Sequence, residues 1–128
     1  MLQWFVMRKT QSFGIDWLQD VLEIRPIFSC KEIFWSAKLN KVLAEEAELE
    51  QNDWALLVLD SLTDHFTGNW GNVSLEQKHM NDSSLKYYLS GGMPPGRLIS
   101  KYNAEGRTVI IVTNDDYTET VVMIEDEL

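Results

Sequence analysis

Apolar and polar positions recur with a helical period in the middle of the chain. Between residues 53 and 65, apolar side chains return every three or four positions, and aspartates occupy another side. This spacing predicts an amphipathic helix. Asn52 or Asp53 is suited to cap its start, and Gly68 is suited to end it, because glycine enters the left-handed conformation without steric cost.

Two further helical segments flank this helix. A helix is predicted over residues 40–50, where Asn40 is suited to cap the start and glutamates line the solvent side. Downstream, Ser74 and Gln77 resemble a capping box. They predict a short helix that runs to about Met80 or further. The polar residues 81–84 that follow are typical of a turn.

The last third of the chain has the pattern of a β-meander. Residues 97–102, 108–113 and 118–124 are rich in β-branched and aromatic side chains. Short turns are predicted between them, at residues 103–106 and 114–117. The middle run is continuously apolar, which indicates a strand that is buried on both faces or covered by helices.

Together these elements predict an α+β fold, in which N-terminal helices pack on a C-terminal three-stranded antiparallel meander. An alternating segment at residues 31–37 predicts an earlier strand that can join the meander. Residues 31–128 then form a single domain, and residues 1–30 form an extension. In the extension, a short amphipathic helix is predicted over about 12–24, ended by Pro26. Its aromatic-rich face must be buried, either against the main domain or against a second chain.

Charge narrows the possible partners. The net charge is −9, and residues 42–128 hold 5 basic and 16 acidic residues. Such a surface repels nucleic acid, and it can face a basic groove on a protein that normally holds nucleic acid. The alternative is a solvated acidic face that serves solubility.

Location and redox chemistry follow from the same composition. No apolar run is long enough to span a bilayer. Near the start, the positive charge follows the apolar residues, which is the reverse of a signal peptide, so we predict a cytoplasmic protein without a membrane partner. Cys30 is the single cysteine, so an internal disulfide is excluded.

Few residues indicate catalytic or metal chemistry. His65, with Asp64 and His79, suggests a general base or a metal site. A metal site needs three or four converging ligands, and the only other soft ligand, Cys30, is distant in sequence. At a helix C-terminus a protonated His65 would interact favourably with the helix dipole, which indicates a structural role. We therefore expect no catalytic residue, no cofactor and no metal.

Other polar residues on the predicted strands have a structural interpretation. Ser100, Thr113 and Thr120 are expected to form cross-strand hydroxyl pairs. The alternative is a small enzyme or ligand-binding domain that uses the region of His65, Asn69 and Arg97. The loop at residues 90–96 lacks the lysine and the following helix of a phosphate-binding loop.

Trp70 lies between Gly68 and Gly71, so we expect the backbone to turn sharply at this large aromatic side chain. The favoured interpretation is a plug that seals one end of the core, with the indole N–H bound to a partner. The alternative is an exposed anchor for another protein. Asn69 and Trp70, with Arg97 and Tyr102, are expected to form a polar cluster that holds the fold together.

Several short motifs follow one another along the second half of the chain. They are His65, Gly68-Asn69-Trp70-Gly71, Asn81, Arg97-Leu98-Ile99-Ser100-Lys101-Tyr102, Val112-Thr113 and Thr118-Glu119-Thr120-Val121. In this order and spacing, residues 32–128 resemble small plasmid-related proteins encoded on mobile elements and in bacterial genomes. Asn69 stands where that family has an acid, and residues 87–95 are an apparent insertion. The resemblance implies a fold and a mobile-element setting, and it implies no particular activity.

These observations predict a non-enzymatic, acidic protein-binding module. Its partner would be a protein complex with a basic nucleic-acid-binding surface, with no direct contact to nucleic acid. The mobile-element setting implies a host defence complex, so the module would be an inhibitor of the anti-CRISPR or anti-restriction type. The alternative is a structural or regulatory homodimer joined through residues 1–30. The side chains expected to bind the partner are Glu45, Glu46, Glu48, Glu50, Asp53, Asp60, Asp64, Trp70, Asp115 and Asp116.

Overall fold

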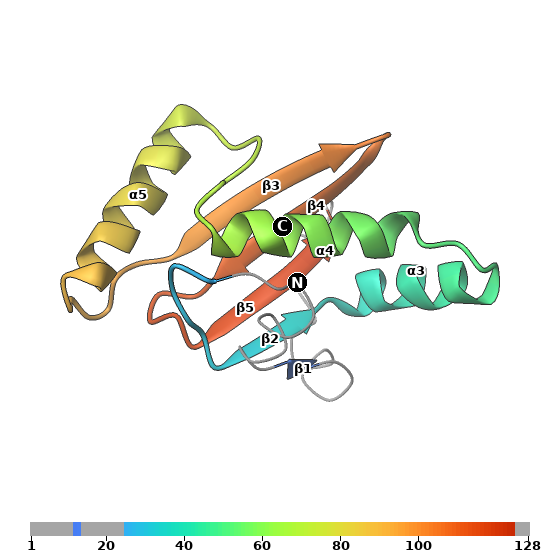
Figure 1. Ribbon diagram of the computed structural model, residues 1–128, viewed down its shortest axis with the longest axis horizontal. Coiled ribbons are helices and arrows are strands. Elements are labelled where there is room, and N and C mark those ends of the chain that lie inside the picture. Colours follow the sequence, from blue (N-terminus) through green and yellow to red (C-terminus); the bar gives the residue numbers. More distant parts are fainter. Residues whose placement is uncertain (1–11, 14–24, 125–128) are drawn as a thin grey trace.

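The computed structural model describes residues 12–13 and 25–124 of the chain. Three helices and five strands lie in this part, and Figure 1 shows α4 lying across one face of the sheet, with α5 standing at the side of β3. In chain order the elements are β1 (Ser12–Phe13), β2 (Glu32–Trp35), α3 (Ala37–Glu48), α4 (Asp53–Phe66), α5 (Leu75–Leu89), β3 (Leu98–Ala104), β4 (Arg107–Thr113) and β5 (Glu119–Ile124).

The strands form one mixed sheet in the order β1-β2-β5-β4-β3. The C-terminal meander β3-β4-β5 is antiparallel throughout, as the pattern of the last third predicts. The earlier strand β2 joins it by pairing parallel to β5, with Ile33 opposite Thr120. A parallel pair needs a long crossover, and here the crossover contains all three helices. The α+β class is therefore confirmed, but the sheet is mixed and extends beyond a three-stranded antiparallel meander.

The two faces of the sheet carry separate apolar clusters, because successive side chains of a strand point to opposite faces. On the first face, side chains such as Ile111 and Val122 pack against apolar residues of α3, α4 and α5. On the second face, Phe34, Ile110 and Met123 belong to a cluster of their own. Every residue from Val109 to Thr113 is buried. The prediction that the middle strand is buried on both faces is confirmed.

The helix caps differ from the predicted ones at two positions. α3 begins earlier than expected, because the hydroxyl of Ser36 accepts the backbone N–H of Leu39 (3.0 Å). Asn40 lies inside the helix, and its Oδ1 accepts the indole N–H of Trp35 (3.1 Å). Asn52 stands at the start of α4, but its side chain makes no capping hydrogen bond.

α5 begins where the sequence predicts and ends much later. The hydroxyl of Ser74 accepts the N–H of Gln77 (3.0 Å), which is the expected cap. The turn predicted at residues 81–84 is wrong, because these residues continue the helix to Leu89. Side chains such as Asn81 compete with helical hydrogen bonds when they bond to their own backbone. Here Asn81 bonds to β3 instead, so the helix is not interrupted.

The segment after α4 bends sharply and lies along the outer edge of β3. Gly68 has φ +86°, as expected for the residue that ends the helix. Gly71 has φ +70°, and a Cβ atom there would collide with the carbonyl oxygen of Lys101. Lys101 donates its N–H to the carbonyl of Trp70 (3.2 Å) and accepts the N–H of Asn72 (2.6 Å). A short parallel bridge therefore closes this part of the β3 edge.

The N-terminal extension is described only in part. Ser12 and Phe13 pair antiparallel with Phe34 and Ile33 of β2, so the helix predicted over 12–24 is wrong at its first two residues. The remainder of that predicted helix, and most of the extension, lies outside the described residues.

Candidate functional site

His65, on the last turn of α4, is enclosed between that helix and the sheet. Its side chain has no solvent exposure. Nδ1 lies 2.6 Å from the hydroxyl of Ser100 on β3, and Nε2 lies 2.8 Å from the hydroxyl of Thr113 on β4. The Thr113 hydroxyl in turn lies 2.7 Å from that of Thr120 on β5. The expected Thr113–Thr120 pair is confirmed, and the network ties α4 to three strands.

Aromatic rings and strands exclude water from the imidazole. Phe28, Phe66 and Trp70 each place a ring edge-to-face against it, at centroid distances of 5.6, 5.4 and 5.7 Å. This burial lowers the pKa of His65 from 6.5 to about 3. The ring is therefore neutral at physiological pH, with one nitrogen donating a hydrogen bond and the other accepting one. The expectation of a protonated histidine at the helix end is wrong, but the structural role is supported.

Cys30 lies in the same core, and its thiol is buried and unreactive. Its side chain is buried, and Sγ donates a weak hydrogen bond to the carbonyl of Glu32 (3.6 Å). Burial raises its pKa from 9.0 to about 11, and a hydrogen bond with Thr120 offsets only part of this effect. At neutral pH the thiol stays protonated, so it is a poor nucleophile and a poor metal ligand.

Trp70 closes the end of the core beside this network. It retains 4% of its exposure, and its indole N–H donates to Oδ1 of Asp82 (2.8 Å). The hydroxyl of Tyr102 donates to the carbonyl of Asn69 (2.6 Å), so the expected cluster forms in part, through Asn69 and Tyr102. The plug interpretation is confirmed. Trp70 is buried and is thus removed from the set of partner-binding side chains.

The three residues of the predicted ligand-binding region do not come together. His65 is enclosed, whereas Asn69 is exposed and its side-chain oxygen accepts the N–H of Gly71 (3.2 Å). Arg97 is also exposed and lines a groove next to α5. Within the described residues, Arg97 has no hydrogen bond to the Trp70 cluster, so the cluster forms without it.

Most of the predicted acidic residues are accessible on the helical layer. Glu45 and Glu48 are exposed on α3, Glu50 follows in the turn to α4, and Asp60 is exposed on α4. Asp64 lies one helical turn further and is partly buried. Its pKa is raised, first by that burial and second by the nearby charge of Asp60. We call Glu45, Glu48, Glu50, Asp60 and Asp64 the helical acidic set.

Glu46 does not belong to this set. It is buried, with 8% of its exposure retained, and its Oε1 accepts the backbone N–H of Trp54 (2.8 Å). This N–H lies in the first turn of α4, where backbone donors lack partners within the helix. Glu46 therefore supplies the cap that Asn52 does not, and its assignment to the solvent side of the helix is wrong.

The remaining predicted acids lie elsewhere or have a partner. Asp53 is 3.4 Å from Arg107, which partly neutralises it. Asp115 and Asp116 lie in the turn between β4 and β5, at the opposite end of the molecule from the α3–α4 connection (Figure 1). Hydrogen bonds from Thr118 hold the pKa of Asp116 below its usual range. The predicted partner-binding acids therefore divide into two separate groups.

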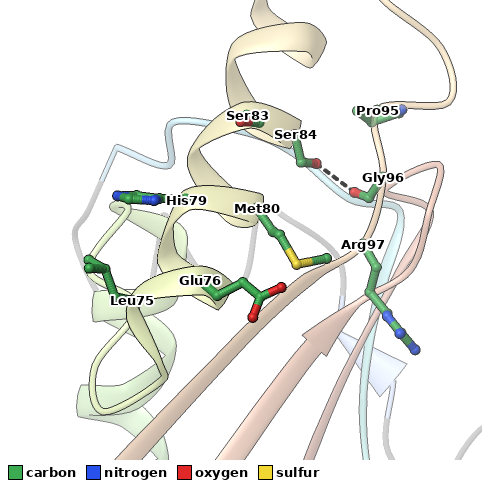
Figure 2. Close-up of a pocket in the computed structure, with 9 residues that line it drawn as sticks. All are labelled: Leu75, Glu76, His79, Met80, Ser83, Ser84, Pro95, Gly96 and Arg97. Atoms are coloured by element: carbon green, nitrogen blue, oxygen red, sulfur yellow. Dashed lines mark hydrogen bonds between the residues drawn. The ribbon is translucent and has the colours of Figure 1, made fainter.

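A groove that the sequence pattern did not indicate lies between α5 and the segment that enters β3. It is open to solvent, with a volume of about 700 Å³. Figure 2 shows Met80 and Glu76 pointing from α5 toward the segment that carries Arg97, whereas Leu75 and His79 point away from it. The groove has the size of a small-molecule site, but few polar groups converge in it. The sequence did not predict this groove, because residues 81–84, which have the composition of a turn, continue the helix α5.

Within the described residues, no group of three or more His, Cys, Asp or Glu side chains is placed to hold a metal ion. No helix in that part of the chain is both long and apolar enough to cross a membrane.

Comparisons with protein-family models, with curated proteins and with solved structures give no match for this chain. The relation to small plasmid-related proteins therefore stays a prediction from sequence motifs.

Proposed function

We propose that this protein is a non-enzymatic binding module whose helical acidic set docks on a basic surface of another protein. The observation that carries the proposal is the accessibility of these carboxylates. Glu45 and Glu48 are exposed near the end of α3, Glu50 is exposed in the turn that follows, and Asp60 is exposed on α4. The ion pairs of Arg107 are made with Asp53 and Glu105 and do not engage this set. We infer that its exposed carboxylates can contact a partner.

The internal polar groups support a binding role without catalysis. The imidazole of His65 is enclosed and bonded at both nitrogens, and burial raises the pKa of the Cys30 thiol to about 11. Groups in this state stabilise the fold and are poorly placed to exchange protons with a substrate.

The class of partner follows from charge and from the sequence motifs. An acidic surface complements the basic grooves with which proteins hold nucleic acid. The resemblance to plasmid-related proteins adds a mobile-element setting. We therefore infer that the partner is a host defence complex, such as a CRISPR effector or a restriction enzyme, and that binding in the bacterial cytoplasm blocks its access to DNA.

The test is capture of a purified CRISPR effector or restriction enzyme by the immobilised full chain. Captured protein is washed at about 0.1 M and then about 1 M salt, which shortens the Debye length from about 10 Å to about 3 Å. We expect capture at low salt, release at high salt, and inhibition of DNA cleavage by the added chain. Capture that is indifferent to salt would exclude the acidic surface as the contact.

A matched pair of variants locates the contact. Neutralising Glu45, Glu48 and Asp60 to Gln, Gln and Asn should weaken binding at least about tenfold, or about 1.4 kcal/mol. The control neutralises Glu76, Asp115 and Asp116, which are exposed and lie outside the helical acidic set. Both variants change the net charge equally, so a general charge effect would weaken them alike and would contradict a localised docking surface.

A further inference from the structure

A hollow opens to solvent beside α4, between that helix and the end of β3. Its volume is about 400 Å³, and its lining comes from α4, from the segment at Gly71 and from the last residues of β3. The residues that α4 contributes are Leu57, Asp60, Ser61 and Asp64. They recur every three or four positions, so they share one side of the helix. We call this feature the α4 hollow.

The hydroxyl of Ser61 is buried at the α4 hollow without a partner. Ser61 retains 1% of its exposure, and within the described structure its Oγ has no hydrogen bond. A helical serine or threonine ordinarily bonds to the carbonyl four residues earlier, as Thr63 does with Leu59 (3.0 Å). Buried polar groups are nearly always bonded, so an unbonded one that lines a hollow indicates a ligand that completes it.

Two carboxylates stand beside this hydroxyl. Asp60 and Asp64 lie one helical turn apart, where side chains are neighbours with about 5–6 Å between their Cβ atoms. Burial, and second the charge of Asp60, raise the pKa of Asp64. The two like charges therefore oppose each other, and a cation placed between them would stabilise both.

The donors of a guanidinium group match these acceptors. Two carboxylates are too few ligands for a metal ion, and the described residues contain no larger set of acidic, His or Cys side chains placed to hold one. A guanidinium presents five N–H donors in a plane, so it can reach both carboxylates and the Ser61 hydroxyl at once, whereas an ammonium has three donors at one point. Leu57 and Tyr102 add apolar surface for the methylene groups of an arginine.

We propose that the α4 hollow binds the guanidinium of an arginine side chain of the partner, held by Asp60 and Asp64 and donating to Oγ of Ser61. The inference rests on the proposed docking function, and it assigns one defined contact within the helical acidic set. Surfaces that hold nucleic acid are rich in arginine because this side chain also binds phosphate, so such a partner supplies the required group.

Titration of the ¹⁵N-labelled full chain with N-acetyl-arginine amide tests the proposal, because it needs no partner protein. Backbone amide shifts are followed by NMR at a constant ionic strength of about 0.1 M. We expect saturable shifts centred on residues 57–64 and 101–104. N-acetyl-citrulline amide has nearly the same shape without the charge and should cause no saturable shift. N-acetyl-lysine amide should bind at least about threefold more weakly.

Three variants locate the site. Asp60→Asn should weaken arginine binding about tenfold, and Ser61→Ala about threefold. The unfolding temperature of Ser61→Ala should stay unchanged, because its hydroxyl has no internal hydrogen bond to lose. Glu48→Gln is the control, since it removes the same charge from an exposed residue outside the α4 hollow and should keep the affinity. The absence of saturable shifts, equal affinity for the lysine probe, or equal weakening by Glu48→Gln would each overturn the proposal.

The outcomes also separate this contact from the proposed function. Arginine binding in the α4 hollow, without capture of a CRISPR effector or restriction enzyme, would support the contact and reject that class of partner. Salt-sensitive capture without arginine binding would reject the contact alone.

Discussion

Oδ1 of Asn81 accepts the backbone N–H of Ile99 (3.1 Å), and Nδ2 of Asn81 donates to the carbonyl of the same residue (2.7 Å). The side-chain amide therefore occupies the outer edge of β3 as a neighbouring strand would. Together with the bridge between Gly71 and Lys101, it closes successive positions of an edge that would otherwise invite pairing with another chain.

Replacing Asn81 by alanine should reveal how much the closed edge of β3 contributes to stability and to the prevention of self-association. The substitution removes two hydrogen bonds to the half-buried Ile99, and a typical hydrogen bond contributes about 0.5–1.5 kcal/mol net. We expect the free energy of unfolding to fall by about 1–3 kcal/mol in urea titration, and self-association to increase. Ser83→Ala is the control, because Ser83 is exposed on the same helix. Equal effects of the two changes would contradict a special role for Asn81.

The buried His65 predicts a defined pH dependence of stability. The unfolded chain binds a proton at His65 with a pKa of about 6.5, whereas the folded chain binds it only near about 3. Below about pH 6.5 the unfolded state therefore binds more protons, and the free energy of unfolding falls by up to about 1.4 kcal/mol per pH unit. This contribution is fully present above pH 6.5 and declines as the pH falls.

The measurement is the free energy of urea unfolding at several pH values between about 5 and 6.5. This window lies above the usual pKa range of the carboxyl groups. His65→Gln should lose the histidine slope in this window, at a reduced overall stability. His79→Gln should keep it, because His79 is exposed on α5. A slope that survives in His65→Gln would show that another group is responsible.

Trp70 should behave as a core residue under mutation. Trp70→Ala removes a large ring that retains 4% of its exposure, and such truncations cost about 3–5 kcal/mol. Trp70→Phe keeps an aromatic ring and loses the hydrogen bond to Asp82, so a smaller loss is expected. Thermal or urea unfolding measures both. A loss below about 1 kcal/mol for Trp70→Ala would instead indicate an exposed anchor.

Glu45 and Glu46 are neighbours with opposite environments, which makes them a matched pair. Glu46→Ala removes the acceptor of the Trp54 N–H, and loss of a helix cap costs about 0.5–2 kcal/mol. Glu45 is exposed, so Glu45→Ala should change stability by no more than about 0.5 kcal/mol. Glu46→Gln keeps an acceptor oxygen and should be intermediate. Identical effects at the two positions would exclude the capping role.

Much of the fold follows from local patterns. The alternation in the last third predicts the three strands of the meander, and the helical period predicts α4 with its end at Gly68. The capping role of Ser74 and the burial of Trp70 also follow from short-range signals. In each case the residue's own preference and its tertiary surroundings favour the same state, so the local signal is sufficient.

The errors arise where a side chain finds a partner that is distant in sequence. The run at 81–84 contains turn-forming residues, but Asn81 and Ser84 bond to residues 99 and 96, and the helix continues. Glu46 resembles its exposed neighbours, yet it bonds to the start of the next helix. His65 resembles a charged helix end, but strands and rings enclose it.

The sequence by itself thus determined the α+β class, the meander and the acidic character of the chain, because period, turn chemistry and charge are local or additive properties. Only the tertiary structure decided that β2 lies parallel to β5, that His65 is neutral, and which carboxylates remain available to a partner. These depend on which distant groups exclude water or supply a hydrogen bond, and packing alone sets those distances.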